Sequence, residues 1–79
     1  MNQLKHNEIT QTDLDLYFFY RQNGINQGYF SRYFLHLKTS RTTIEAFNTT
    51  NEEYFELFGD YKYSCIRSFR ISLKNFMKQ

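Results

Sequence analysis

Residues 24–34 of this 79-residue chain read Gly-Ile-Asn-Gln-Gly-Tyr-Phe-Ser-Arg-Tyr-Phe. Gly24 suits the left-handed conformation that closes a helix, and Ile25 can pack back on the last turn of that helix. Asn26 can cap a following helix that runs from Gln27 to about residue 38. The apolar positions of this helix recur at the helical spacing and comprise Phe30, Tyr33, Phe34 and Leu37. Its opposite face carries Gly28, Ser31, Arg32, Leu35 and His36. The segment therefore predicts two helices that meet at a tight turn.

The chain before this turn predicts an arm and one helix. Residues 1–11 show no hydrophobic periodicity and predict a mobile N-terminal arm, so the folded domain is expected to span residues 12–79. Thr12 is followed by acidic residues, which favours a helix that is capped by Thr12 and covers residues 14–22.

The middle of the chain predicts two short helices. The first covers Thr43–Phe47, with Ile44 and Phe47 turned toward the core. The polar run at residues 48–51 is expected to end it. The second covers residues 54–58 and ends at Gly59.

The last segment has the clearest helical periodicity in the chain and predicts a helix over residues 63–77. Its apolar stripe comprises Ile66, Phe69, Leu73 and Phe76. Its opposite face is basic and comprises Arg67, Arg70, Lys74 and Lys78. Ile71 lies on the basic side, without a core role. Together these segments predict an all-α fold, a compact bundle of four to five short helices.

The first half also carries a β-hairpin signal. Aromatic-rich runs at residues 14–20 and 29–37 flank Asn23-Gly24, a dipeptide that is common in hairpin turns. The alternative is therefore an α+β fold, with an N-terminal aromatic hairpin followed by helices. The loop between the two runs would span about eight residues rather than two, and the second run follows the helical period. We therefore predict the all-α fold.

The composition limits the class of protein. Nine Phe and seven Tyr, without Trp, predict a core built from a few bulky rings. The single cysteine, Cys65, excludes an intrachain disulfide and is predicted to be a small buried core residue. The chain contains no apolar run of membrane-spanning length and no signal peptide, so we expect a cytoplasmic protein with no membrane partner. Frequent Asn, Lys, Ile, Tyr and Phe are typical of AT-rich coding DNA and indicate a low-GC bacterium, phage or plasmid.

The charged side chains are arranged in blocks of one sign. All charged side chains in residues 16–44 are basic, and they belong to Arg21, Arg32, Lys38 and Arg41. Residues 45–60 carry only acidic residues, which are Glu45, Glu52, Glu53, Glu56 and Asp60. Residues 61–79 are again only basic, with Lys62, Arg67, Arg70, Lys74 and Lys78. Either the acidic block neutralises a basic block within the fold, or the basic residues form a binding face.

Residues 16–35 resemble the helix-turn-helix unit of bacterial and phage DNA-binding regulators. The resemblance rests on a turn glycine, the apolar residue after it, the cap of the recognition helix, a buried position and a Ser-Arg pair, which are Gly24, Ile25, Asn26, Phe30, Ser31 and Arg32. Two positions depart from the family. Tyr20 stands where a small residue, usually Ala, is found, and Asn23 stands where an apolar residue is found. A tyrosine at this position is expected to wedge the two helices apart.

The resemblance implies a helix-turn-helix-like fold and a set of contacts to duplex DNA. On the second helix Gln27, Ser31 and Arg32 would meet base edges, with Arg32 suited to guanine. Phosphate contacts would come from Arg21, Lys38 and Arg41. Independently of the resemblance, the basic face of the last helix, with Arg67, Arg70 and Lys74, is suited to track phosphates or an acidic protein surface. Because one small unit reads few base pairs, we expect a homodimer. The function implied is that of a regulator or accessory factor of a mobile element or phage.

A protein from a different functional class is the alternative. It is a small phage or plasmid protein that binds and modulates a host or structural protein through an aromatic, block-charged surface. Tyr20, Asn23 and the acidic block fit this hypothesis. Catalysis is poorly supported, because His6 and His36 have no second imidazole or thiolate at metal-ligand spacing and the chain has no glycine-rich phosphate loop. We therefore predict no enzymatic activity, no metal and no cofactor.

Overall fold

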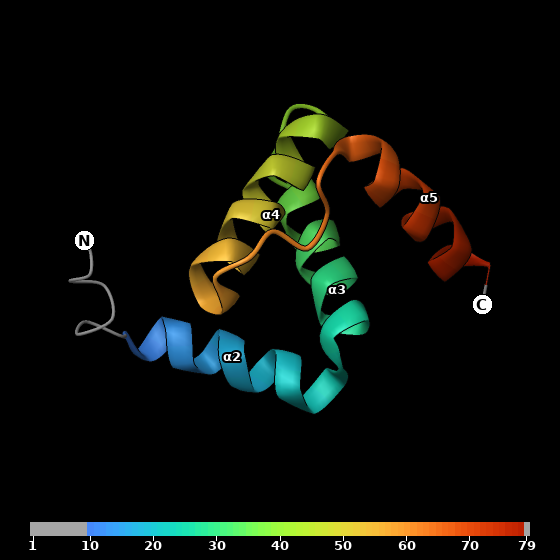
Figure 1. Cartoon of the computed structure of the whole chain (residues 1–79). Coiled ribbons are helices and arrows are strands. Elements are labelled where there is room, and N and C mark those ends of the chain that lie inside the picture. The colour runs from blue at the N-terminus through green and yellow to red at the C-terminus, as the bar shows by residue number, and fades with distance from the viewer. Residues whose placement is uncertain (1–9, 79) are drawn as a thin grey trace.

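The computed structural model describes residues 10–78, and in this range the chain forms four α-helices and no strand. The helices are α2 (Gln11–Asn23), α3 (Ile25–Leu37), α4 (Thr43–Phe58) and α5 (Ile66–Met77) (Figure 1). The all-α prediction is confirmed. The hairpin alternative is wrong, because residues 14–20 and 29–37 both lie in helices. Residues 1–9 of the predicted arm lie outside the described residues.

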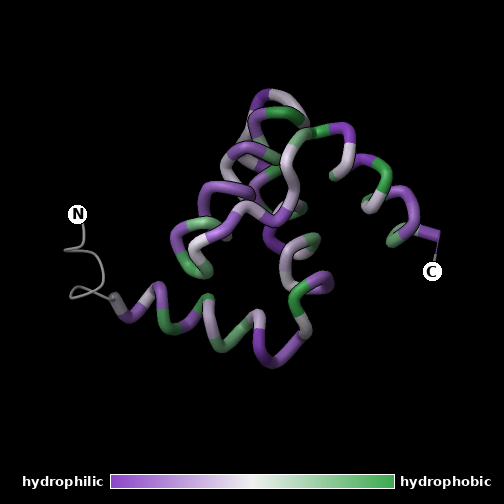
Figure 2. The backbone as a smooth tube through the Cα atoms, in the orientation of Figure 1, coloured by the Kyte–Doolittle hydropathy of each residue, from purple (hydrophilic) through white to green (hydrophobic). Residues whose placement is uncertain are grey.

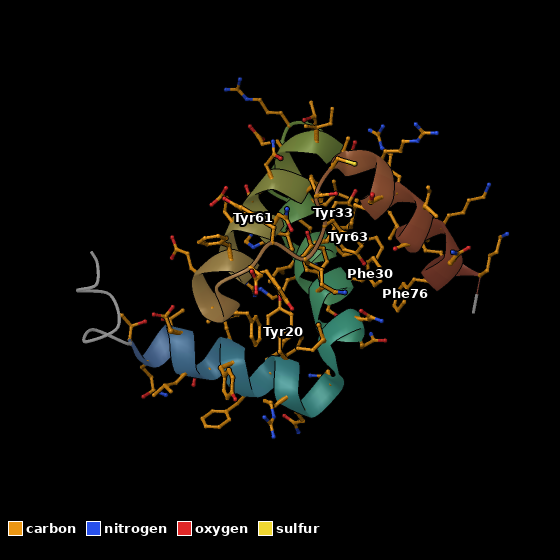
Figure 3. All side chains as sticks on the ribbon, in the orientation of Figure 1. Tyr20, Phe30, Tyr33, Tyr61, Tyr63 and Phe76 are labelled. Atoms are coloured by element: carbon orange, nitrogen blue, oxygen red, sulfur yellow. The ribbon has the colours of Figure 1, made fainter. Side chains whose placement is uncertain are left out.

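The helix α3 lies between the other elements of the fold. α4 runs alongside it, and α2 lies across the ends of both at the bottom of Figure 1, where Tyr20 meets the ring of Phe58 at 5.4 Å between centroids. α5 packs across α3 and α4 through Phe69, and Phe76 further along α5 stacks on Phe30 at 4.4 Å. Figure 3 shows Phe30 and Phe76 side by side between the two helices.

The core is made mainly of aromatic rings, as the composition predicts. Its buried members are Tyr20, Tyr29, Phe30, Tyr33, Ala46, Phe47 and Phe69. Phe69 is the central ring, because it contacts rings from three other parts of the chain, including Tyr33 at 4.7 Å, Phe47 at 4.9 Å and Tyr63 at 5.6 Å between centroids. Most of these ring pairs are edge-on or tilted, which are favourable aromatic geometries.

The start of α2 and the α2–α3 turn differ from the prediction. Thr10, not Thr12, caps α2, because its side chain accepts from the Asp13 N–H while the Asp13 carboxylate accepts from the Thr10 N–H in a capping box. Gly24 is the only non-helical residue between α2 and α3. Its φ of 92° and ψ of 150° fall in a region that is open almost only to glycine, rather than in the left-handed helical region. Asn26 therefore lies inside α3 and caps nothing.

The buried face of α3 is rotated from the predicted one. Tyr29 is fully buried, whereas Phe34, predicted to face inward, is 36% exposed. Gly28, predicted to face outward, is buried against Tyr20 of α2. The rotation arises because α3 has neighbours on several sides, so its buried arc is wider than a stripe of four residues.

The middle of the chain forms one continuous helix, α4, and the predicted break at residues 48–51 is wrong. Thr50 is fully buried and its hydroxyl donates to the Ala46 carbonyl at 2.8 Å. Asn51 is buried as well, and its side chain bonds to groups outside the helix. These bonds satisfy polar side chains that otherwise disfavour a helix interior. Phe47 is buried as predicted, but Ile44 is 48% exposed, so its inward placement is wrong.

α5 has the predicted amphipathic arrangement and begins at Ile66 rather than at residue 63. Phe69 is buried, and Ile66, Leu73 and Phe76 are partly buried against the core. Figure 2 shows hydrophilic and hydrophobic residues succeeding one another along this helix. The later start has a local cause, because the backbone of Tyr63 bonds to the Asn51 side chain instead of entering the helix.

Candidate nucleic-acid interface

The outward face of α5 is a row of cations. Arg67, Arg70, Lys74 and Lys78 are all exposed. Among residues 10–78, none of the four makes an ion pair with a carboxylate. Because the apolar side of α5 is used in the core, the charged side is turned away from it.

The four glutamates of the acidic block lie on α4, Asp60 follows the end of that helix, and none of the five pairs with a base of α5 among the described residues. The Glu45 carboxylate accepts from the backbone N–H of Arg41 at 2.7 Å, and Glu52 accepts from the hydroxyl of Tyr61 at 3.0 Å. Glu53 pairs with side chains of α3. Among the described residues, the glutamates of α4 and the bases of α5 therefore lie on separate helices and form no ion pairs with each other.

Arg32 takes part in a bidentate ion pair within the fold. Its Nε donates to Glu53 Oε1 at 2.8 Å and an Nη donates to Oε2 at 2.7 Å. His36 lies one turn further along α3, with Nε2 3.2 Å from the same Oε2. The two charged side chains are only 20% and 18% exposed, so water screens this pair less than a surface pair. Arg32 thus joins α3 to α4, and its guanidinium fork is occupied where a guanine contact was predicted.

The other predicted contacts of α3 lie on its solvent side. Gln27 is exposed and Ser31 is half-buried, and their side chains meet at 3.5 Å. The same side carries the apolar residues Phe34 and Leu35, of which Leu35 is 48% exposed. Each residue advances by about 100° around the helix axis, so Arg32 points about 100° or more away from Gln27, Ser31 and Phe34. Arg32 therefore lies on a different face of α3 from these three residues. The exposed strip of α3 is therefore narrow and partly apolar.

The remaining predicted phosphate contacts lie at the helix ends. Arg21 is exposed in the last turn of α2, where its guanidinium stacks over the Tyr17 ring at 5.9 Å. Lys38 and Arg41 are exposed in the turn between α3 and α4. Figure 1 shows this turn at the same end of the molecule as the start of α5.

Tyr20 does not wedge α2 away from α3, because Gly28 accommodates its ring. A Cβ atom at position 28 would lie 2.6 Å from Tyr20 Cδ1. The small residue that helix-turn-helix units carry on their first helix is in effect replaced by a glycine on the second. The connection itself, the single residue Gly24, is shorter than the three- to four-residue turn that is usual in the motif.

Cys65 is exposed at the N-cap of α5, so its predicted burial is wrong. Its Sγ lies 3.5 Å from the Ser68 hydroxyl, and hydrogen bonding to Ser68 lowers the pKa of the thiol.

A hollow of about 320 Å³ lies between α2 and α4. It is lined by Thr12, Asp13, Leu16, Thr49, Glu52, Glu53, Glu56 and Leu57. In residues 10–78 no group of three potential ligands, His, Cys, Asp or Glu, is placed to hold a metal ion.

Ile71 is a residue of this surface that sequence reasoning left without a role. It is 58% exposed on the basic side of α5, one residue after Arg70 and three before Lys74. Its position on the charged face was readable from the helical period. The sequence could not predict that the rest of the described chain leaves Ile71 exposed.

Comparison with known proteins adds no family to this description. No protein-family model matches the chain, and no curated protein or solved structure is similar to it. None of the described helices is long and apolar enough to cross a membrane.

Proposed function

We propose that this protein binds duplex DNA and that the cationic face of α5 is its main contact with the phosphate backbone. The separation of charges carries the proposal. Within residues 10–78, Arg67, Arg70 and Lys74 are exposed and make no ion pair, while the four glutamates of the acidic block lie on α4. Cations that the fold leaves without carboxylates are suited to replace the counterions of DNA phosphates.

Three further cations extend this contact. Lys38 and Arg41 lie in the α3–α4 turn, at the same end of the molecule as the start of α5 in Figure 1, and Arg21 lies at the end of α2. Each phosphate contact adds to the salt dependence of binding. Arg32 is left out of the contact set because Glu53 occupies its guanidinium.

The biological role that fits this activity is that of a regulator or accessory factor of a mobile element or phage. A single unit of this size covers few base pairs, so the protein is expected to act as a homodimer on paired half-sites. This role follows from the small size, the residue bias and the charge pattern of the chain.

The test is fluorescence anisotropy with duplex DNA at about 50 and about 200 mM salt. The wild-type protein should bind at the lower salt concentration and lose much of its affinity at the higher one. The triple variant Arg67→Gln, Arg70→Gln, Lys74→Gln should bind more weakly and show a smaller salt slope. The double variant Glu45→Gln, Glu52→Gln is the control and should retain binding, since both changes lie on α4. No binding to any duplex at the lower salt concentration would contradict the proposal.

A second candidate function is favoured by the outer face of α2. Leu14, Tyr17 and Phe18 are spaced as neighbours on one helix face and remain exposed, Phe18 at 60%. This apolar strip fits the alternative in which the protein binds and modulates a host or structural protein. Capture from host lysate after nuclease treatment tests it. A stoichiometric protein partner that is lost in Phe18→Ser supports this function, and recovery of nucleic acid alone argues against it.

A further inference from the structure

The outward face of α5 combines cationic side chains with an apolar one. On α5, Arg67, Arg70, Ile71 and Lys74 stand at relative positions 0, +3, +4 and +7. At about 100° per residue they fall within an arc of about 100°. All four are exposed. Side chains at these relative positions are the ones with which a helix in the major groove meets base edges.

α3 and α5 are the two helices that could enter the major groove, and they differ in how much of their surface other helices cover. α3 is covered by Tyr20 of α2 at Gly28, by Glu53 of α4 at Arg32 and by Phe76 of α5 at Phe30. Among residues 10–78, the core contacts of α5 come from the side that carries Ile66, Phe69, Leu73 and Phe76. The major groove is about 12 Å wide and about as wide as a helix with its side chains, so an inserted helix must stand clear of its neighbours. Of the two helices compared, α5 has the freer outward face.

The chemistry of the α5 face matches base edges better than it matches a lipid surface. A helix that binds lipid inserts its apolar side, but Phe69 and Phe76 of α5 are held in the core. What remains outward is cationic, with one aliphatic side chain, Ile71, among the charges. Arginine pairs with guanine through two hydrogen bonds, and an aliphatic side chain packs on the thymine methyl group.

We propose that α5, rather than α3, is the helix that reads the base sequence in the major groove. Ile71 contacts a thymine methyl group, and Arg67 pairs with a neighbouring guanine. Lys74 and Lys78 hold the flanking phosphates. This inference rests on the proposed function, since it assigns the specificity of a protein that binds DNA.

Two substitutions separate base reading from charge. Ile71→Ala leaves every charge in place, and Arg67→Lys retains the charge but removes the planar fork that pairs with guanine. Neither side chain makes a hydrogen bond or an ion pair with another described residue, so the fold should be unaffected. Gln27→Ala is the matched control, because it removes the exposed polar side chain through which α3 would read bases instead.

The experiment first selects a preferred site from a randomised duplex library with the wild-type protein. Anisotropy at one salt concentration then gives the affinity ratio between that site and a scrambled duplex. Ile71→Ala and Arg67→Lys should each lower this ratio about tenfold or more, with unchanged affinity for the scrambled duplex and an unchanged salt slope. Gln27→Ala should leave the ratio unchanged.

The outcomes distinguish this inference from the proposed function. If Gln27→Ala lowers the ratio and the α5 variants do not, α3 reads the bases and the inference is overturned while DNA binding stands. Binding without any sequence preference likewise overturns only the inference. If no duplex binds and an acidic protein is captured through α5 instead, both are overturned.

Discussion

Tyr20 is a fully buried residue whose hydroxyl finds no hydrogen-bond partner among the described residues. An unsatisfied buried hydroxyl costs about 1–3 kcal/mol, so Tyr20→Phe should raise the free energy of unfolding by about 1 kcal/mol. Urea unfolding followed by circular dichroism measures this change. Tyr29→Phe is the matched control, because the Tyr29 hydroxyl donates to Asn51 Oδ1 at 3.1 Å. It should lower the free energy by about 1 kcal/mol. Equal losses in both variants would argue against the unsatisfied hydroxyl.

The same two tyrosines make the fold sensitive to high pH. Burial is the main cause that raises the pKa of Tyr20 and Tyr29 above the usual value of about 10. Above pH 10 the unfolded chain therefore loses phenolic protons that the folded protein retains. The unfolded state then binds fewer protons, and the free energy of unfolding falls as the pH rises. This stabilisation is complete below about pH 10 and lost above it.

We expect urea midpoints to change little from these groups up to about pH 9 and to fall steeply above about pH 10. Each group contributes a slope of at most about 1.4 kcal/mol per pH unit. The phenolate absorbance that Tyr20 and Tyr29 contribute should rise together with unfolding rather than before it. Tyr20→Phe should flatten the fall in stability. Ionisation of all tyrosines in a protein that remains folded would be the contrary result.

At the scale of elements, Asn51 holds α5 in place. Its Oδ1 accepts from the Tyr29 hydroxyl and from the Tyr63 N–H, and its Nδ2 donates to the Tyr63 carbonyl at 2.9 Å. One side chain of α4 thus provides hydrogen-bond partners for the Tyr29 hydroxyl of α3 and for the Tyr63 backbone in the segment that leads into α5. Without these bonds the buried groups of Tyr29 and Tyr63 lose partners.

Asn51→Ala should lower the free energy of unfolding by about 2–3 kcal/mol, since several buried hydrogen bonds are lost together. Amide hydrogen exchange should also become faster in α5 than in α3. Asn48→Ala, an exposed change in the same helix, is the control and should lie within about 0.5 kcal/mol of wild type. Equal effects of the two alanine variants would show that Asn51 does not anchor α5.

At the scale of the whole molecule, the Arg32–Glu53 ion pair supports the fold, and the cationic face of α5 does not. The pair Arg32–Glu53 joins α3 to α4 in a partly buried, bidentate geometry. The bases of α5 make no ion pair with the described residues. Stability and surface charge are therefore separable.

Glu53→Gln should lower the melting temperature by several degrees, because a hydrogen-bonded charge partner of Arg32 is worth about 1.5–3 kcal/mol. The α5 variant with Arg67, Arg70 and Lys74 all changed to Gln should melt close to wild type. Differential scanning calorimetry measures both. A large loss of stability in the α5 variant would show that these bases serve the fold instead of a ligand.

Local pattern was enough to predict α5 and the all-α class. The period of apolar and charged residues along an amphipathic helix predicts its buried and solvent faces. Phe69 lies on the buried face of α5 and Arg70 on the exposed face, as this period predicts. Gly59 likewise ends α4 as predicted, with a positive φ of 85°. These features depend on neighbours in the chain, so the sequence carries them directly.

The remaining features were decided by residues far apart in the chain. Thr50 and Asn51 read as a helix break, yet the Ala46 carbonyl and Tyr63 backbone satisfy them and α4 continues. Arg32 reads as a DNA contact, yet Glu53, 21 positions away, occupies it. Tyr20 reads as a wedge between α2 and α3, yet Gly28 leaves room for its ring. The sequence alone determined the helical class of the fold and which face of α5 is charged. Only the tertiary structure decided which polar groups find partners inside the fold and which remain for a ligand, because those partners come from other helices.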